Sequence, residues 1–118
     1  MLTVFSIRLV SSDESLIAIL STLDSLLGPT KVAPGCMGAR LYTDLKQSNA
    51  LFFVEEWASR EQFEKNLDTA KLRTIVAAIE LSSQAPVVRV DLVEREEGVD
   101  ALAAYLNPGA VPPITPTH

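Results

Sequence analysis

The sequence predicts an α+β domain of the ferredoxin-like class, in which a four-stranded antiparallel sheet carries its helices on one face. The main observation is the order β-α-β-β-α-β, indicated by apolar residues that alternate in four short segments and recur at helical spacing in two longer ones. A short further helix is expected near the C-terminus. The chain's 118 residues, 47% hydrophobic and 21% charged, suit one globular domain.

The first strand is expected at Leu2–Val10, which is rich in Val, Ile, Leu and Phe. A helix follows, because Ser11 and Glu14 have the spacing of a capping box and apolar residues then recur at helical intervals up to Leu27. The Gly-Pro pair at 28–29 predicts the end of this helix, since glycine suits a left-handed cap and proline cannot continue the helix.

The second and third strands are expected at Cys36–Leu45 and Ala50–Trp57, joined by polar residues 46–49. In the second strand, Met37 is expected to share a face with Ala39 and Leu41. Alternation along the third strand predicts four side chains on one face and three on the other: Leu51, Phe53, Glu55 and Trp57 against Phe52, Val54 and Glu56.

The second half begins with a capping box at Ser59-x-x-Gln62, which predicts a helix that breaks at Asp68 or Thr69 and then continues to about Leu81. The fourth strand is expected at Val87–Val93 and the additional helix at Val99–Leu106. Residues 1–97 therefore form the predicted domain. Residues 98–118 form a short helix and a Pro-rich tail, either loose or lying on a partner.

Helices on one face leave the other face of the sheet bare. Val4, Phe52 and Val54 are expected there, and apolar residues on a bare sheet face favour association. A homodimer with the two sheets face to face is the simplest prediction.

Composition excludes several classes of function. A net charge of −5 opposes binding to nucleic acid or to an anionic membrane, and no apolar run approaches the roughly 20 residues of a membrane helix. The single Cys36 excludes a disulfide framework within the chain and a thiolate zinc site, and the one histidine, His118, is the last residue. Without a basic segment before its apolar start, the chain is expected to be cytoplasmic.

One stretch of the sequence resembles a known family. The residues that carry the resemblance are Pro34-Gly35-Cys36-x-Gly38, then Phe53-x-Glu55-x-Trp57-x-Ser59, then Phe63, Asn66 and Leu67. This pattern is similar to that of the antibiotic biosynthesis monooxygenase superfamily, whose members are dimeric α/β barrels and include quinol monooxygenases. The order of strands and helices fits over about residues 1–97.

The resemblance implies a homodimer with a pocket between sheet and helices in each subunit. It also implies oxidation of a quinol or an aromatic polyketide by molecular oxygen without a metal or flavin cofactor, with the substrate supplying the electrons. This chain departs from the pattern of many quinol-oxidising members, which carry a histidine where Asn66 stands. Heme-degrading members bind iron through a histidine on the second helix, and residues 72–80 contain none.

The candidate catalytic residues are Glu55, Trp57 and Asn66. Glu55 is expected to point towards the helices, either as an acid or base or in an ion pair with Lys or Arg. Trp57 either stacks on a substrate ring or fixes the corner between strand and helix. Asn66 either binds a substrate oxygen or faces solvent.

The candidate substrate-binding residues are Phe53, Met37, Tyr42 and Phe63. Tyr42 is either a hydroxyl donor or an aromatic at the dimer face, and Phe53 and Met37 line either a pocket or the core.

Three functions remain open from the sequence. The leading hypothesis is a cofactor-independent monooxygenase acting on a small aromatic molecule. The second is a non-catalytic dimer that binds a small hydrophobic ligand, as in a stress response, and the absence of a histidine at position 66 favours it. The third is an isomerase- or cyclase-like enzyme in which Glu55 shuttles a proton.

Overall fold

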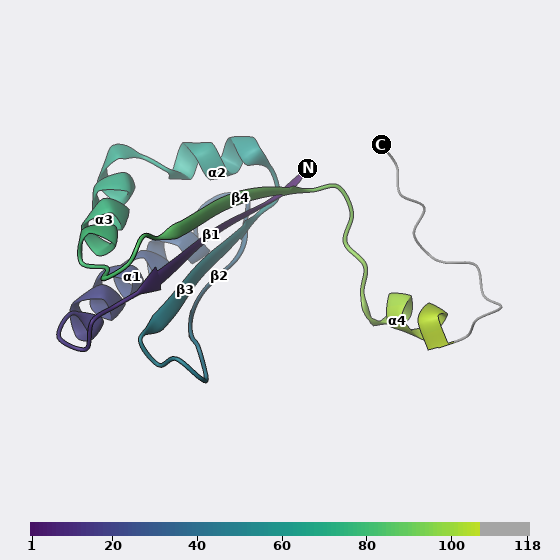
Figure 1. Cartoon of the computed structure of the whole chain (residues 1–118). Coiled ribbons are helices and arrows are strands. Elements are labelled where there is room, and N and C mark those ends of the chain that lie inside the picture. Colours follow the sequence, from purple (N-terminus) through teal and green to yellow (C-terminus); the bar gives the residue numbers. More distant parts are fainter. Residues whose placement is uncertain (107–118) are drawn as a thin grey trace.

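The computed structural model describes residues 1–106 of the chain (Figure 1). Its elements are β1 (Leu2–Val10), α1 (Leu16–Lys31), β2 (Cys36–Thr43), β3 (Ala50–Trp57), α2 (Arg60–Asn66), α3 (Thr69–Glu80), β4 (Val87–Val93) and α4 (Val99–Leu106). The four strands form one antiparallel sheet in the order β2-β3-β1-β4, and α1, α2 and α3 lie over one face of it (Figure 1). The predicted ferredoxin-like class is confirmed. The expected Pro-rich tail lies mostly beyond residue 106, outside the described residues.

The strands begin and end as predicted, except that β2 ends at Thr43 and not at Leu45. The side chain of Asp44 ends this strand, because its Oδ1 accepts from the backbone N–H groups of Lys46 (2.8 Å) and Gln47 (3.2 Å) and so closes a turn. Leu45 is fully exposed in that turn.

Both ends of α1 differ from the prediction. The capping box at Ser11 is not formed, because the Ser11 N–H donates to Asn49 O (2.8 Å) beside the sheet and its hydroxyl donates to Ser12 O. At the other end the helix continues through the Gly-Pro pair to Lys31. Its last turn is held by tertiary contact, since Thr30 is buried and its Oγ1 accepts from Lys71 Nζ (3.2 Å). Tertiary contacts here override local helix-ending signals.

The capping box of α2 and the break after it are confirmed. Ser59 Oγ accepts from the Gln62 N–H at 3.2 Å, as the pattern predicts. The helix stops at Asn66, and the Asp68 carboxylate begins α3 by accepting from the Lys71 N–H at 2.9 Å. This second cap fixes where Lys71 lies, in the first turn of α3.

The core lies between the sheet and the three helices. It comprises mainly the alternate side chains of β1 and β3 and the apolar stripes of the helices: Phe5, Ile7, Leu9, Leu51, Phe53 and Trp57 with Ile19, Leu23, Leu26, Phe63, Ile75 and Ala78. The predicted faces of β3 are therefore confirmed, and β1 shows the same alternation. In β2, a bulge between Cys36 and Gly38 takes Met37 out of the alternation, so that its side chain is 56% exposed. The expectation that Met37 shares a face with Ala39 and Leu41 is wrong for this reason.

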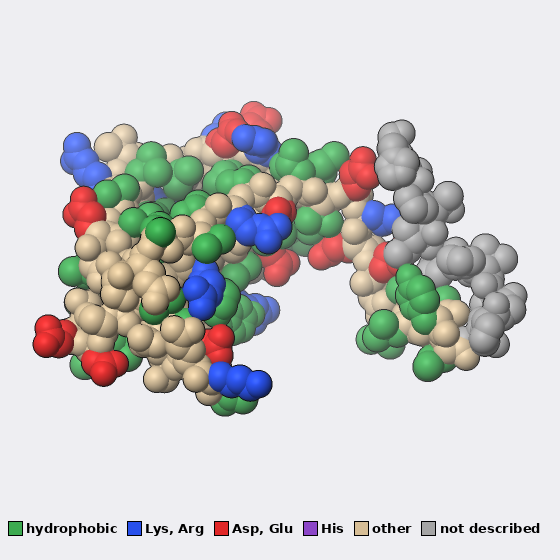
Figure 2. All heavy atoms as spheres, viewed as in Figure 1, with side chains coloured by type: hydrophobic (Ala, Val, Ile, Leu, Met, Phe, Trp, Pro, Cys, Tyr) green, Lys and Arg blue, Asp and Glu red, His purple; other side chains and the backbone are tan. Residues whose placement is uncertain are grey.

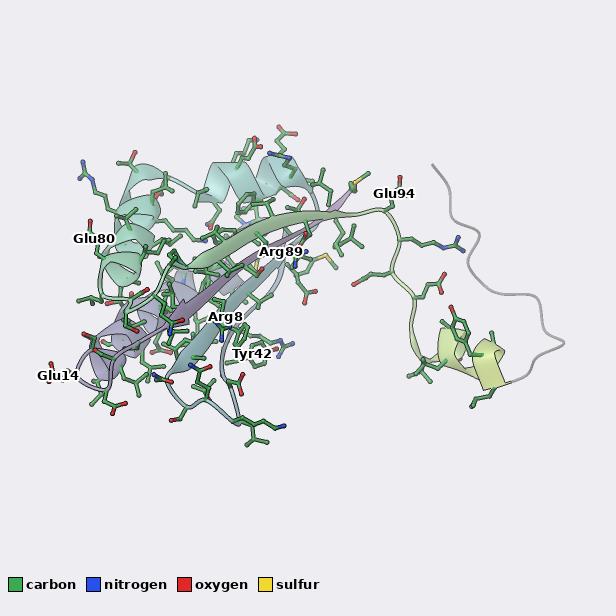
Figure 3. The ribbon with its side chains drawn as sticks, in the orientation of Figure 1. Arg8, Glu14, Tyr42, Glu80, Arg89 and Glu94 are labelled. Atoms are coloured by element: carbon green, nitrogen blue, oxygen red, sulfur yellow. The ribbon has the colours of Figure 1, made fainter. Side chains whose placement is uncertain are left out.

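The opposite face of the sheet is uncovered. Val4, Phe52 and Val54 are only half-buried there. Figure 3 shows Arg8, Tyr42 and Arg89 projecting from the sheet away from the helices. Arg8 lies over the Phe52 ring, 5.6 Å from its centroid. Among the described residues, no helix has the length and apolar character needed to cross a lipid bilayer.

Gly35, just before β2, provides a test of this fold. Its φ is +83°, and an added Cβ would lie 2.2 Å from the Gln62 side chain, which is itself tied to Ser59. We expect Gly35→Ala to lower the free energy of unfolding by about 1–2 kcal/mol or more, since left-handed backbone alone costs a residue with a Cβ that much. Urea denaturation checks this. Gly38→Ala is the matched control, because nothing lies within 4 Å of its added Cβ; equal losses in both variants would contradict the expectation.

Candidate functional site

A carboxylate and an ammonium group are buried together beneath the helices. Glu55 is 0% and Lys71 8% exposed, and Glu55 Oε2 lies 2.6 Å from Lys71 Nζ. Glu55 Oε1 accepts from Trp57 Nε1 at 2.9 Å. Alternation along β3 turns Glu55 and Trp57 towards the helices, and the Asp68 cap places Lys71 above them. Each buried charge is therefore neutralised by a partner, which burial requires.

Lys71 Nζ has two further acceptors. It donates to Thr30 Oγ1 at 3.2 Å and to Asn66 Oδ1, and it lies 5.6 Å from the centroid of the Trp57 ring. Lys71 Nζ thus has three polar neighbours, Thr30 and Asn66 through hydrogen bonds and Glu55 through the ion pair. Because Lys71 is 8% exposed, a ligand at the surface is expected to respond to it mainly through a neighbour that contacts Lys71 and is itself more exposed.

Asn66 is that neighbour. Because an ammonium group only donates, Lys71 must face the oxygen of the Asn66 amide, and the NH₂ group lies on the other side of the amide carbon. Asn66 is half-buried at the end of α2, and two surface hollows meet at it. The contact with Lys71 therefore turns the NH₂ group of Asn66 away from the buried ion pair, on a residue that lines both hollows.

The two hollows are each large enough for a small ligand. One, of about 340 Å³, lies beside the loop after α1 and has a mostly apolar wall; it is lined by Ala33, Pro34, Gln62, Lys65 and Asn66. The other, of about 300 Å³, lies between α1 and α3; it is lined by Ser25, Leu26, Pro29, Thr30, Asn66, Asp68, Ala70, Lys71 and Thr74.

Aromatic side chains fill the space behind Asn66. The ring centroids of Trp57 and Phe63 are 6.5 Å apart and those of Phe63 and Phe5 are 5.2 Å apart, within the range of favourable aromatic pairs. Trp57 and Phe53 are 0% exposed and Phe63 is 4% exposed. The interior between sheet and helices is thus packed with side chains, and the hollows at Asn66 lie outside it.

The structure brings five of the seven predicted site residues together. Glu55, Trp57, Phe53, Phe63 and Asn66 form one continuous group between β3 and α2. Met37 and Tyr42 are not part of it. They line a third and larger hollow of about 620 Å³ along the outer edge of β2, which we call the β2 groove. Its lining residues are Leu27, Lys31, Cys36, Met37, Gly38, Ala39, Arg40, Leu41 and Tyr42.

Two residues of the site, Lys71 and Thr30, were not predicted from the sequence. A signal for Lys71 was present, because it lies on the buried stripe of α3 with Ile75 and Ala78, where a cation needs an anionic partner. The inward-facing Glu55 is that partner. No comparable signal marks Thr30, which is buried only because α1 continues past its expected end. Within residues 1–106, no three His, Cys, Asp or Glu side chains gather in a way that would hold a metal ion.

Comparison with known proteins gives one family and several similar folds. Residues 7–78 match the family model described as antibiotic biosynthesis monooxygenase. Rv0793 from Mycobacterium tuberculosis is 20% identical with a TM-score of 0.74, over 83% of this chain and all of that one. A variant of SnoaB, a cofactor-independent oxygenase from Streptomyces nogalater, is 14% identical with a TM-score of 0.68, over 80% and 95%. At these identities the likeness to solved structures shows a shared fold. No curated protein matches the sequence.

Proposed function

The chain belongs to the antibiotic biosynthesis monooxygenase family, and on that basis we propose that it oxidises a small aromatic quinol or polyketide-like substrate with molecular oxygen, without a metal or flavin. The observation that supports this most is the Asn66 amide, whose oxygen accepts from Lys71, so that its NH₂ group is turned away from Lys71 on a residue that lines both hollows. A donor in that position suits a phenolate or enolate oxygen, where the substrate's negative charge resides.

The chemistry balances without a further reactant. In a substrate with a CH₂ group between two phenolic rings, the substrate ionises and its carbanion reduces O₂. The resulting hydroperoxide loses water, so that CH₂ and O₂ become C=O and H₂O. The role of Asn66 is to hold the anionic oxygen, and that of the apolar wall at Ala33 and Pro34 is to bind the aromatic ring.

Glu55 is assigned a supporting role in this proposal. One of its oxygens accepts from Trp57 and the other pairs with Lys71, and the side chain is 0% exposed. It therefore holds Lys71, which holds Asn66, and the substrate's proton passes to water. Trp57 anchors Glu55 through its indole N–H.

Oxygen uptake tests the proposal. Purified protein, treated with a chelator, is mixed with hydroquinones and anthrones in an oxygen electrode, and products are followed by absorbance. We expect uptake above the protein-free rate with at least one substrate and no gain on adding flavin or iron. Rates equal to those of buffer across the panel would count against catalysis.

A second candidate is a non-catalytic protein that binds a small hydrophobic ligand. The observation that favours it is Asn66 itself, because an amide cannot take up a substrate's proton as the histidine found there in many quinol-oxidising members could. The chain's single tryptophan separates the candidates, since ligand-dependent change in its fluorescence without oxygen uptake would support binding alone.

The family is typically dimeric, and we propose a homodimer formed through the bare face of the sheet. Its support is the set of half-buried apolar side chains Val4, Phe52 and Val54. We expect Val54→Glu to convert a dimer into a monomer at micromolar concentration, because it buries an unpaired carboxylate in the interface. Sedimentation velocity measures this. Val88→Glu is the matched control, because Val88 lies on β4 and is on the helix-facing side of the sheet, away from the proposed interface. A monomeric wild-type protein would refute the homodimer.

A further inference from the structure

The chain ends its described part in an arm that leaves the domain. Residues 94–98 run from the end of β4, at the labelled Glu94, and carry α4 away from the sheet (Figures 1 and 3). None of the residues of α4 is buried, and its large apolar side chains are widely exposed: Val99 81%, Leu102 65%, Tyr105 70% and Leu106 86%. A helix of eight residues is not stable alone in water, so this one needs a surface to pack on.

The outer edge of β2 offers a surface of matching chemistry. This strand pairs only with β3, so the N–H and C=O groups along its other side have no strand partner within residues 1–106. Beside this edge lies the β2 groove of about 620 Å³. Its apolar walls include the exposed Met37 and Tyr42, and its basic groups are Lys31 and Arg40.

We propose that the arm of one copy lies in the β2 groove of a second copy. The arm carries exposed Glu94, Glu96 and Asp100, which complement the basic groups of the groove, and the apolar side of α4 complements Met37 and Tyr42. The extended residues before α4 add alongside β2 as a further strand, which satisfies its open edge. The inference rests on the homodimer proposed above.

The sheet order explains why the groove belongs to a second copy. The arm starts at β4, and its own β2 lies at the opposite edge of the sheet. Three strand spacings, about 14 Å, separate the two edges. The arm projects away from the rest of the domain (Figure 2). When two such sheets meet face to face about a two-fold axis along the strands, each β4 edge lies against the partner's β2 edge. The arm then reaches the groove of that partner directly.

Cross-linking between two thiols tests the inference, because Cys36 is the only cysteine of the chain. Cys36→Ser/Met37→Cys is mixed with Cys36→Ser/Leu102→Cys, and the mixture is treated with a short bis-maleimide. We expect a cross-linked heterodimer as the main product. Cys36→Ser/Val88→Cys, which places a thiol on β4 at a position 49% exposed against 56% for Met37, is the comparison partner and is expected to give little product with Leu102→Cys.

Each other outcome would overturn the inference. Cross-linking found only when both thiols are on one chain would mean that α4 folds back on its own groove, and preferred reaction at position 88 would place it elsewhere. Charge reversal gives a second readout. Lys31→Glu is expected to lower the yield of the 37–102 cross-linked product several-fold, and Asp100→Lys is expected to restore it. An unchanged yield in both variants would contradict the charge match. A dimer by sedimentation without the 37–102 product refutes the arm exchange alone, whereas a monomer refutes the homodimer as well.

Discussion

Lys71→Met is expected to lower the free energy of unfolding by about 3–5 kcal/mol, because it leaves the Glu55 carboxylate buried without its counter-charge. The carboxylate would keep only the Trp57 indole N–H, and the Asn66 oxygen would lose its donor. Urea denaturation followed by circular dichroism measures the effect. Lys65→Met is the matched control, since Lys65 is exposed on α2 and its ion pair with Glu61 spans 3.5 Å at the surface.

The double variant Glu55→Gln/Lys71→Met separates the loss of charge balance from the loss of packing. Because a neutral amide has no charge to compensate, we expect the double variant to be more stable than Lys71→Met alone. A Lys71→Met protein as stable as the Lys65→Met control would show that the buried pair does not have the electrostatic role assigned to it.

Asn66→Asp is expected to lower kcat/KM for the quinol or anthrone substrate by a factor of about 10²–10³, which is the usual loss when one donor to a developing oxyanion is removed. Aspartate keeps an oxygen for Lys71, so the fold is retained, but it presents a carboxylate oxygen to the ligand in place of the NH₂ group. Oxygen uptake measures the rate, and urea denaturation confirms the fold.

Gln47→Glu is the control for this variant, because it makes the same amide-to-carboxylate change in the exposed loop between β2 and β3. Asn66→Ala removes both the donor and the acceptor for Lys71, and we expect it to lose stability as well as activity. Wild-type kcat/KM in Asn66→Asp would remove Asn66 from the site.

Most of the fold could be predicted because hydrophobic periodicity and turn chemistry act locally. The alternation in β1 and β3 and the capping box at Ser59 each depend on residues close in the sequence. The errors arose where distant contacts override local signals. The helix α1 runs through Pro29 because Thr30 packs against Lys71. Ser11 does not cap this helix, because its backbone N–H is hydrogen-bonded to the carbonyl of Asn49.

The site was predictable in part for the same reason. Strand alternation placed Glu55 and Trp57 on the inward face, and the helix after them carried Phe63 and Asn66. The role of Glu55 depends on its ion pair with Lys71, which lies sixteen positions further along the chain, on helix α3. Only the folded structure shows that the two side chains meet. A single bulge residue moved Met37 to the surface, which alternation cannot foresee.

The contacts of Lys71 give the buried ion pair a purpose beyond stability. A buried pair of charges is seldom more stabilising than well-packed apolar residues would be. Here Lys71, held by Glu55, donates to the Asn66 oxygen and so turns the NH₂ end of that amide away from the pair. Under the proposed function, this orientation selects ligands that offer an acceptor oxygen.

A crystal structure with a bound quinol or quinone tests this central claim most directly. The expected result is a ligand oxygen about 2.9 Å from Asn66 Nδ2, with Lys71 Nζ still on Asn66 Oδ1 and the ring against Ala33 and Pro34. A ligand oxygen bonded to Lys71 itself, or a ligand seated away from Asn66 in the groove along β2, would contradict it.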